Sequence, residues 1–248
     1  MIRLRMKQRL LAFPATLART AFFYVFGVFW TGLVAYIVVI PLALVERLLG
    51  LRHSQAAHSS LHRWVPLCSL PWRLVTDVRV IADDRVGEGE AVVISNHHSF
   101  IDIFLLFHVF PRIRMTARPT LYRSPFLGWA MSALAHIPHR EDQPEMALEQ
   151  SAEWLHRGTF VGVFPEGTRA PSGTVGPFQS GAFRLAQRTT QQVQPVVVVG
   201  TGDVWGKGQF WIHRLGPVTM KVLPPVHVPA DAGRTELRKI IADTRELM

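Results

Sequence analysis

A histidine and an aspartate stand five residues apart in the segment Asn96-His97-His98-Ser99-Phe100-Ile101-Asp102. An apolar run at 91–95, typical of a strand, comes before this segment, and an apolar run at 101–110, typical of a helix, follows. With a turn between the strand and the helix, Asp102 falls in the first helical turn and can reach back to the His97 imidazole. A carboxylate there would hold the tautomer that leaves the other ring nitrogen free as a general base.

Spacing alone leaves other interpretations of this segment open. His98 and Asp102 are four residues apart, so His98 is an alternative base, and a metal site that includes His108 is a further alternative. No third ligand has convincing spacing and the motif H-E-x-x-H is absent, so we expect no metal and no cofactor. A capped helix with a polar start and no catalytic role is the remaining interpretation.

A second predicted strand, 159–165, also ends in polar residues, in the loop Pro165-Glu166-Gly167-Thr168-Arg169. A guanidinium suits a phosphate group, and backbone N–H groups exposed in a tight loop can stabilise an oxyanion. Taken alone, the loop is equally compatible with a solvated turn that contains an ion pair.

Together, N-H-x-x-x-x-D and F-P-E-G-T-R resemble the motifs of the glycerolipid acyltransferase family, whose best-known members are 1-acylglycerol-3-phosphate (lysophosphatidic acid) acyltransferases. The resemblance covers about residues 75–225. Its other blocks follow in the family's order: Arg118 ahead of 125–129, 137–140 ending in Arg140, 178–182, and 195–200.

The resemblance implies transfer of an acyl chain from acyl-CoA or acyl carrier protein to the sn-2 hydroxyl of lysophosphatidic acid, which gives phosphatidic acid. In this reaction His97 would be the general base and Asp102 would orient it. The backbone around Glu166 and Gly167 would be the oxyanion site. The substrate-binding residues expected are Asn96 (which would also shape the turn), Arg118, Arg140, Glu166, Gly167, Thr168 and Arg169, with the arginines on the phosphate.

Three departures from the family's pattern leave the acceptor lipid open. Arg118 and Gln179 stand where the family commonly has lysine, and Ala170 stands where a serine often follows the arginine. Relatives with the same motifs act on other lysolipids, including lyso-ornithine lipid, which has no phosphate. The rival function classes are a metal-dependent phosphoesterase and a non-catalytic protein that binds the membrane surface.

Composition narrows the class of protein further. The 248 residues are 48% hydrophobic and 18% charged, which excludes a disordered chain, a collagen and a coiled coil. The net charge of +9 comes from 23 arginines and four lysines against 18 acids, yet no nucleic-acid recognition motif accompanies it. We therefore expect lipid partners and no nucleic acid. The single cysteine, Cys68, excludes a disulfide framework and favours a reducing compartment.

From about residue 77, strand-like runs alternate with helical patterns. We predict strands at 78–82, 91–95, 112–117, 159–165, 194–200, 211–216 and 219–228, and helices at 101–110, 124–135, 144–158, 181–189 and 230–248. Alternation of this kind predicts an α/β fold, a mixed β-sheet flanked by helices. We expect an acyltransferase domain at 71–248 behind a membrane-associated helical segment at 1–70.

The segment from Thr20 to Val45 contains no charged residue. As a helix it would reach roughly 39 Å, enough to cross a hydrocarbon core of about 30 Å. Basic residues lie on both sides of it, so they set its orientation only weakly. Because both acyl donors are cytosolic, we expect residues 1–70 to form a bent helical pair that dips into the cytoplasmic leaflet of the inner membrane. Gly27, Gly32 and Pro41 are places where the helix can bend. Whether the segment spans the bilayer or only dips into it stays open.

Overall fold

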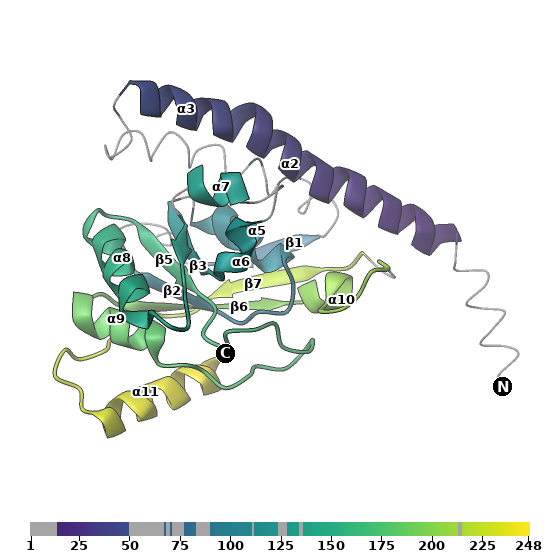
Figure 1. The fold of residues 1–248 in the computed structure, drawn as a ribbon. Helices are drawn as coiled ribbons and strands as arrows, with labels where there is room; N and C mark the ends of the chain where they lie inside the picture. Colours follow the sequence, from purple (N-terminus) through teal and green to yellow (C-terminus); the bar gives the residue numbers. More distant parts are fainter. Residues whose placement is uncertain are drawn as a thin grey trace, which may run out of the picture.

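The computed structural model describes residues 14–49, 67, 70, 77–82, 90–110, 112–123, 128–133, 136–212 and 215–248, and these form a seven-stranded sheet with helices on both faces (Figure 1). The strands are β1 (Val78–Ile81), β2 (Val92–Ser95), β3 (Ile113–Ala117), β4 (Ile137–Pro138), β5 (Phe160–Val163), β6 (Val193–Val199) and β7 (Val218–Val222). Their order across the sheet is β1-β7-β6-β2-β5-β3-β4, and β6–β7 is antiparallel while the other pairs are parallel. The predicted mixed sheet is confirmed.

The middle of the sheet is covered on both faces. All four residues of β2 are buried, and Val92, Val93 and Ile94 are fully buried. A run of β-branched residues without polar alternation is typical of a parallel strand between two helical layers. The polar residues that follow β2 are therefore carried by one of the most enclosed strands of the sheet.

Two layers of helices enclose this sheet. The helices of the body are α5 (Ile101–Val109), α6 (Pro119–Tyr122), α7 (Gly128–Ala133), α8 (Pro144–His156), α9 (Gly181–Thr189), α10 (Thr201–Trp205) and α11 (Arg234–Leu247). Residues of α5 and α10 belong to the apolar core on one face, together with Phe23 of the N-terminal helix. The core on the other face is formed with α8, α9 and α11. Figure 1 shows α8, α9 and α11 on the side of the sheet away from the N-terminal helix.

The N-terminal helix is continuous over residues 14–48 and lies along the body (Figure 1). After helical residues 14–22 it consists of π-helical η1 (Phe23–Phe29), α2 (Trp30–Val34), π-helical η2 (Ala35–Val39) and α3 (Ile40–Leu48). The helix thus runs through Pro41. The backbone hydrogen-bond register changes immediately before it, where a missing N–H is most easily accommodated. Residues 1–13 and most of 50–76 lie outside the described residues, and so do residues 71–76, which follow the predicted boundary at 70/71.

The predicted strand at 211–216 is wrong for the residues of it that are described, which form no strand. Its apolar side chains serve a different contact: Ile212 is fully buried, and its backbone N–H donates to Thr20 Oγ1 at 2.9 Å. The described residues of this run therefore belong to a loop, which contacts the N-terminal helix through Ile212. Of the predicted helix 124–135, Gly128–Ala133 is helical as α7, and the remainder is not described. The short elements α6, β4 and α10 were not predicted.

Candidate active site

Five strands deliver polar residues to one edge of the sheet. Because β2, β3, β4, β5 and β6 run in one direction, their carboxyl ends meet at the same edge. The residues that follow these ends are His97 after β2, Arg118 after β3, Arg140 after β4, Glu166 after β5 and Thr201 after β6. The topology therefore gathers the residues predicted from separate motifs.

The His97–Asp102 pair has the geometry that its sequence spacing predicted. His97 Nδ1 lies 3.0 Å from Asp102 Oδ2, and the Asp102 side chain is fully buried. The same Oδ2 accepts hydrogen bonds from the backbone N–H groups of His98 (2.7 Å) and Ser99 (2.8 Å). The other oxygen, Oδ1, accepts from Thr201 Oγ1 at 2.5 Å.

These contacts accord with one hydrogen-bonding arrangement of the pair. The backbone N–H groups of His98 and Ser99 can only donate, so Asp102 Oδ2 is an acceptor of both. With Nδ1 as the donor to the same oxygen, the tautomer expected from the sequence fits this geometry and leaves Nε2, at the far side of the ring, as the acceptor. Phe164 stacks on the imidazole at a centroid distance of 3.9 Å and holds the ring plane. The His97 side chain is 14% exposed, so a substrate can reach it.

His98, the alternative base, is committed to other contacts. Its Nε2 lies 2.7 Å from the carbonyl oxygen of Thr174, and because a carbonyl only accepts, Nε2 carries the proton. Its Nδ1 then accepts from Asn96 Nδ2 at 3.3 Å. Both ring nitrogens are thus engaged within the protein. Within the chain segments that the structure describes, no three His, Cys, Asp or Glu side chains gather as metal ligands.

The Asn96 side chain connects the end of β2 to the neighbouring strand β6. Its Nδ2 donates to the carbonyl oxygen of Val198 at 2.8 Å, and its Oδ1 accepts from the Val198 N–H at 2.7 Å. The side chain therefore imitates a strand partner where β2 ends, and it is 2% exposed. Of its two expected roles, this geometry favours shaping the turn over contacting substrate.

Glu166 ties the two motif loops together. Its Oε1 accepts from the His97 backbone N–H at 2.9 Å, and its Oε2 accepts from the Gly176 N–H at 2.8 Å. The carbonyl group of His97 is also bound, because its oxygen accepts a hydrogen bond from the Ala170 N–H at 2.8 Å. The backbone of His97 is thus held at both ends by the second loop and its continuation, so Glu166 acts on the histidine's position.

Gly167 supplies the turn of this loop. Its φ of +68° is a conformation that glycine adopts without strain. Its N–H already donates to the Phe164 carbonyl at 3.0 Å. This bond argues against the expectation that the Gly167 N–H serves as an oxyanion donor.

The three predicted arginines differ in their surroundings. Arg118 Nη2 donates to the Gly167 carbonyl at 3.2 Å, and the Arg169 guanidinium lies 4.8 Å from the centre of the Phe100 ring. Both therefore stand at the second motif loop. Arg140 instead forms two hydrogen bonds to Asp142, at 3.2 and 3.1 Å, and shares its charge with that carboxylate.

Two polar residues at this edge were not predicted from the sequence. Thr201 bonds Asp102, and Lys207 Nζ donates to Thr168 Oγ1 at 3.2 Å. A hydroxyl directly after the strand-ending glycine Gly200 was the available signal for Thr201. Lys207, between two glycines, carried no motif signal, although it is one of only four lysines.

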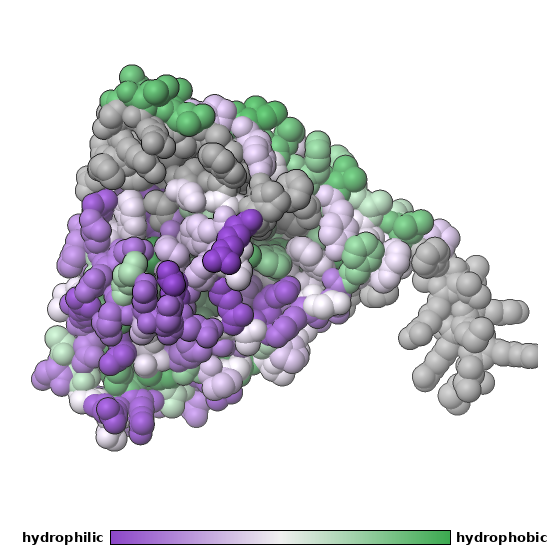
Figure 2. Space-filling model, in the orientation of Figure 1, coloured by the Kyte–Doolittle hydropathy of each residue, from purple (hydrophilic) through white to green (hydrophobic). Residues whose placement is uncertain are grey.

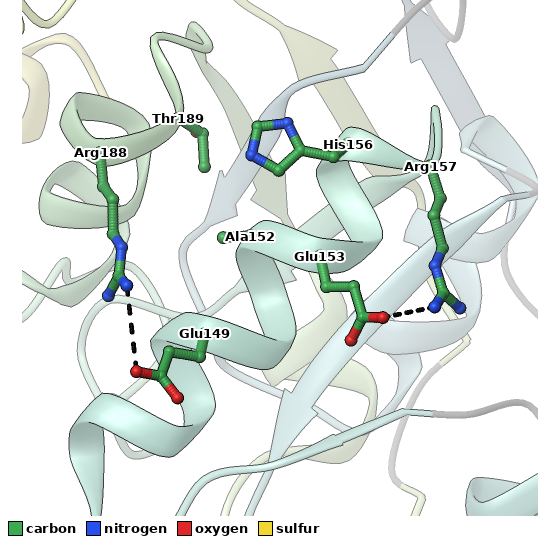
Figure 3. Close-up of a pocket in the computed structure, with 7 residues that line it drawn as sticks. All are labelled: Glu149, Ala152, Glu153, His156, Arg157, Arg188 and Thr189. Atoms are coloured by element: carbon green, nitrogen blue, oxygen red, sulfur yellow. Dashed lines mark hydrogen bonds and ion pairs between the residues drawn. The ribbon is translucent and has the colours of Figure 1, made fainter.

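A surface groove of about 480 Å³ lies away from this edge (Figure 3). It runs between the later turns of α8 and the last turn of α9, and each of these helices leads into the amino end of the next strand. The groove therefore lies toward the edge opposite His97. The Arg188 side chain extends across it toward Glu149, with a separation of 3.9 Å. Its charges are internally paired, and it is not the site.

The sheet edge thus combines a buried carboxylate, an oriented imidazole and cations at the adjacent loop, on an α/β fold. Residues 77–199 match the model of the acyltransferase family, so the chain contains an acyltransferase domain, and this match includes both motif loops.

Named relatives make the comparison specific. The chain is 34% identical over 165 residues to a chloroplastic 1-acyl-sn-glycerol-3-phosphate acyltransferase of Arabidopsis thaliana, covering 65% of this chain and 46% of that protein. It is 32% identical to a 1-acyl-sn-glycerol-3-phosphate acyltransferase of Pseudomonas aeruginosa, covering 65% of each. The matches span about half the length of most of the curated relatives.

A solved structure resembles nearly the whole chain. It is the crystal structure of the 1-acyl-sn-glycerophosphate (LPA) acyltransferase PlsC from Thermotoga maritima, with a TM-score of 0.72 and 25% sequence identity. The match covers 95% of this chain and 97% of that one. The N-terminal helix and the sheet therefore belong to one shared architecture.

Proposed function

We propose that this protein transfers an acyl chain from acyl-CoA or acyl carrier protein to the sn-2 hydroxyl of lysophosphatidic acid, forming phosphatidic acid. The observation that carries the proposal is the 3.0 Å contact between His97 Nδ1 and the fully buried Asp102 carboxylate, beside a loop that bears cations. The names of the relatives and of the solved structure support the same reaction.

The proposed reaction is direct transfer with His97 as general base. Nε2 removes the proton of the acceptor hydroxyl while the hydroxyl oxygen forms a bond to the thioester carbonyl carbon. The tetrahedral intermediate then collapses, the carbon–sulfur bond breaks, and the thiolate takes the proton from Nε2. Asp102 stabilises the imidazolium that exists between the two proton transfers, as a buried carboxylate does in a serine protease. Cys68 precedes the family domain, and no acyl-cysteine intermediate is required.

The acceptor's phosphate is proposed to bind at the second motif loop. Arg118 and Arg169 stand there, and Lys207 adds an ammonium group next to Thr168. Gln179 provides a neutral amide beside Gly167, at a position where the family commonly has lysine. Lys207 therefore supplies a positive charge at the loop where the family commonly has the charge of a lysine in place of Gln179. This charge favours a phosphate-bearing acceptor over lyso-ornithine lipid.

The N-terminal helix supports a membrane location. Residues Pro14–Val38 form a helix long and apolar enough to cross a membrane, judged by length and composition. Figure 2 shows apolar side chains gathered along this helix above a largely hydrophilic body. Val25, Phe29 and Ile37 are 58%, 65% and 63% exposed, whereas Phe23 is fully buried against the body.

One helix face is thus docked on protein and the opposite face is left for lipid. Phe23 and Tyr24 contact the Trp205 ring edge to face, and Tyr24 stacks on Phe210. A helix attached in this way cannot be surrounded by lipid on all sides. We therefore propose that it lies in the cytoplasmic leaflet of the inner membrane, with the sheet edge facing the cytoplasm.

A panel of acceptors tests the proposed substrate. Purified protein in detergent is mixed with one acyl-CoA and, in turn, with lysophosphatidic acid, lysophosphatidylcholine or lyso-ornithine lipid, and release of CoA is followed. We expect the fastest release with lysophosphatidic acid. Faster release with lyso-ornithine lipid would overturn the assignment of the acceptor while keeping acyl transfer.

A further inference from the structure

An arginine on the C-terminal helix is connected by hydrogen bonds to the backbone of His97. Arg245 lies in the last turn of α11, 46 residues beyond the part of the chain that matches the family model. Its Nε donates to the Gly176 carbonyl and its Nη2 to the Val175 carbonyl, both at 2.8 Å. The guanidinium therefore holds two consecutive carbonyl groups of the loop that follows the second motif.

The connection continues through a single peptide group. The Val175 carbonyl and the Gly176 N–H belong to the same peptide unit, and that N–H donates to Glu166 Oε2 at 2.8 Å. The peptide thus has a cation on its oxygen and a carboxylate on its N–H. Hydrogen bonds polarise one another in such a series, so each strengthens the next.

Glu166 completes the connection to the catalytic base. Its second oxygen accepts from the His97 N–H at 2.9 Å. Space at the middle of the path is tight, since a Cβ atom on Gly176 would stand 2.8 Å from Glu166 Oε2. A shift of the 175–176 peptide would therefore either lengthen one of the two hydrogen bonds of Glu166 or move its carboxylate.

The helix that carries Arg245 is itself held in place. Leu237, Ile240 and Ile241 of α11 pack against the apolar core on its face of the sheet. Arg245 therefore extends from a helix whose position is set by its packing on the core.

We propose that Arg245 is a positioning residue for the acyl transfer: through the 175–176 peptide and Glu166, it sets the position of the His97 backbone. This proposal rests on the proposed function for its kinetic consequence. The positioning itself has a readout that needs no activity.

The test compares Arg245→Gln and Arg245→Lys with Arg238→Gln, a change of an exposed arginine on the same helix. In Arg245→Gln we expect kcat to fall about tenfold with little change in the KM for lysolipid, because small displacements of a catalytic group lower the rate steeply. Arg245→Lys, which keeps a cationic donor, should recover part of kcat, and Arg238→Gln should behave as the unaltered protein.

The readout independent of activity is amide hydrogen exchange in the peptide that contains the His97 N–H. Exchange there should be faster in Arg245→Gln than in Arg238→Gln, at equal global stability measured by thermal unfolding. If Arg245 only fastens α11, the thermal midpoint falls, exchange at His97 is unchanged, and the proposal is overturned. Absence of acyl transfer in the unaltered protein would instead refute the proposed function and leave the exchange comparison valid.

A second variant changes the 175–176 peptide, which lies between Arg245 and Glu166 in this series of hydrogen bonds. Gly176→Ala should displace Glu166 and lower kcat by a similar factor. Because both changes break one connection, the double variant with Arg245→Gln should be no slower than the slower single variant. Multiplicative losses in the double variant would show two independent effects and contradict the proposed path.

Discussion

At the scale of single residues, the Asp102 carboxylate contacts the His97 imidazole and accepts from two backbone N–H groups of the turn before α5, those of His98 and Ser99. In Asp102→Asn the amide can replace an oxygen with a donor, which would favour the wrong tautomer of His97. We expect kcat to fall by about a hundredfold or more, with the fold retained. Steady-state kinetics and a circular dichroism spectrum check both parts, and near-normal kcat would contradict the assigned role.

Thr201 fixes the second oxygen of the same carboxylate from a different strand end. Thr201→Val keeps the shape but removes the donor at 2.5 Å, in a side chain that is fully buried. A hydrogen bond to a charged group contributes about 1.5–3 kcal/mol, so we expect kcat to drop about tenfold or more. Thr201→Ser keeps the hydroxyl and should retain most activity. Equal rates in the two variants would show that the hydroxyl does not matter.

Asp102 and Thr201 illustrate which contacts of the site can be predicted from the sequence. His97 and Asp102 are five positions apart with one turn between them, so their contact followed from local structure. Thr201 is 99 positions from Asp102 and meets it only because β6 pairs with β2. Arg245 depends on the packing of α11 in the same way. Contacts set by strand order leave no local pattern in the sequence.

At the scale of elements, strand β3 buries a cation next to a histidine. Arg114 is fully buried, with its guanidinium 4.5 Å from the centre of the Trp154 ring of α8. Burial lowers the pKa of Arg114 to about 9, so it stays charged at neutral pH. Burial, with repulsion from Arg114, lowers the pKa of His136 to about 3. The neutral His136 ring accepts from the Met115 N–H at 3.1 Å.

His136 therefore makes stability depend on pH. Below its ordinary pKa of 6.5 the unfolded chain binds a proton that the folded protein rejects down to a pKa of about 3, so stability falls as the pH drops through this window. The slope is about 1.4 kcal/mol per pH unit for one group. His136→Asn keeps an acceptor and should have a shallower slope between pH 7 and 5, measured by urea unfolding in detergent. Identical slopes in the variant and the unaltered protein would show that protonation of His136 does not cause the loss of stability.

Elements also account for where the sequence was misleading. The apolar run 211–216 has a strand-like composition, but its described residues pack beside the N-terminal helix, where Phe210 and Trp205 meet Tyr24. Apolar composition indicates that a segment is buried, but it does not indicate whether a sheet or a helix covers it. The helices predicted at 144–158 and 181–189 are confirmed as α8 and α9, with bounds that differ by two residues at most.

At the scale of the whole molecule, the face of the N-terminal helix turned away from the body should control membrane binding. Replacing Phe29 and Ile37, which are 65% and 63% exposed, with serine removes apolar area that lies mostly at the surface. We expect the double variant to sediment less with anionic vesicles while its rate on detergent-dispersed substrate stays normal. Met146→Ser on α8, with 48% exposure of the native side chain, is the matched control and should sediment normally. Equal sedimentation of both variants would argue against a lipid-facing helix.

The molecule as a whole combines a long apolar helix that is exposed on one side with a sheet edge that carries a histidine, the buried carboxylate that contacts it, and cations. Residue placement at that edge follows from parallel strands, and the helix follows from a long uncharged segment. The acceptor lipid and the acyl donor depend on the shape of side chains around the edge, which local sequence patterns do not encode.

Acyl transfer with His97 as the base is best tested by release of CoA from acyl-CoA, with and without lysophosphatidic acid, by the unaltered protein and by His97→Ala. We predict release that requires the lysolipid in the unaltered protein and no release above background in His97→Ala, with the variant folded to the same thermal midpoint. Lysolipid-dependent release at full rate in His97→Ala would contradict the proposed mechanism.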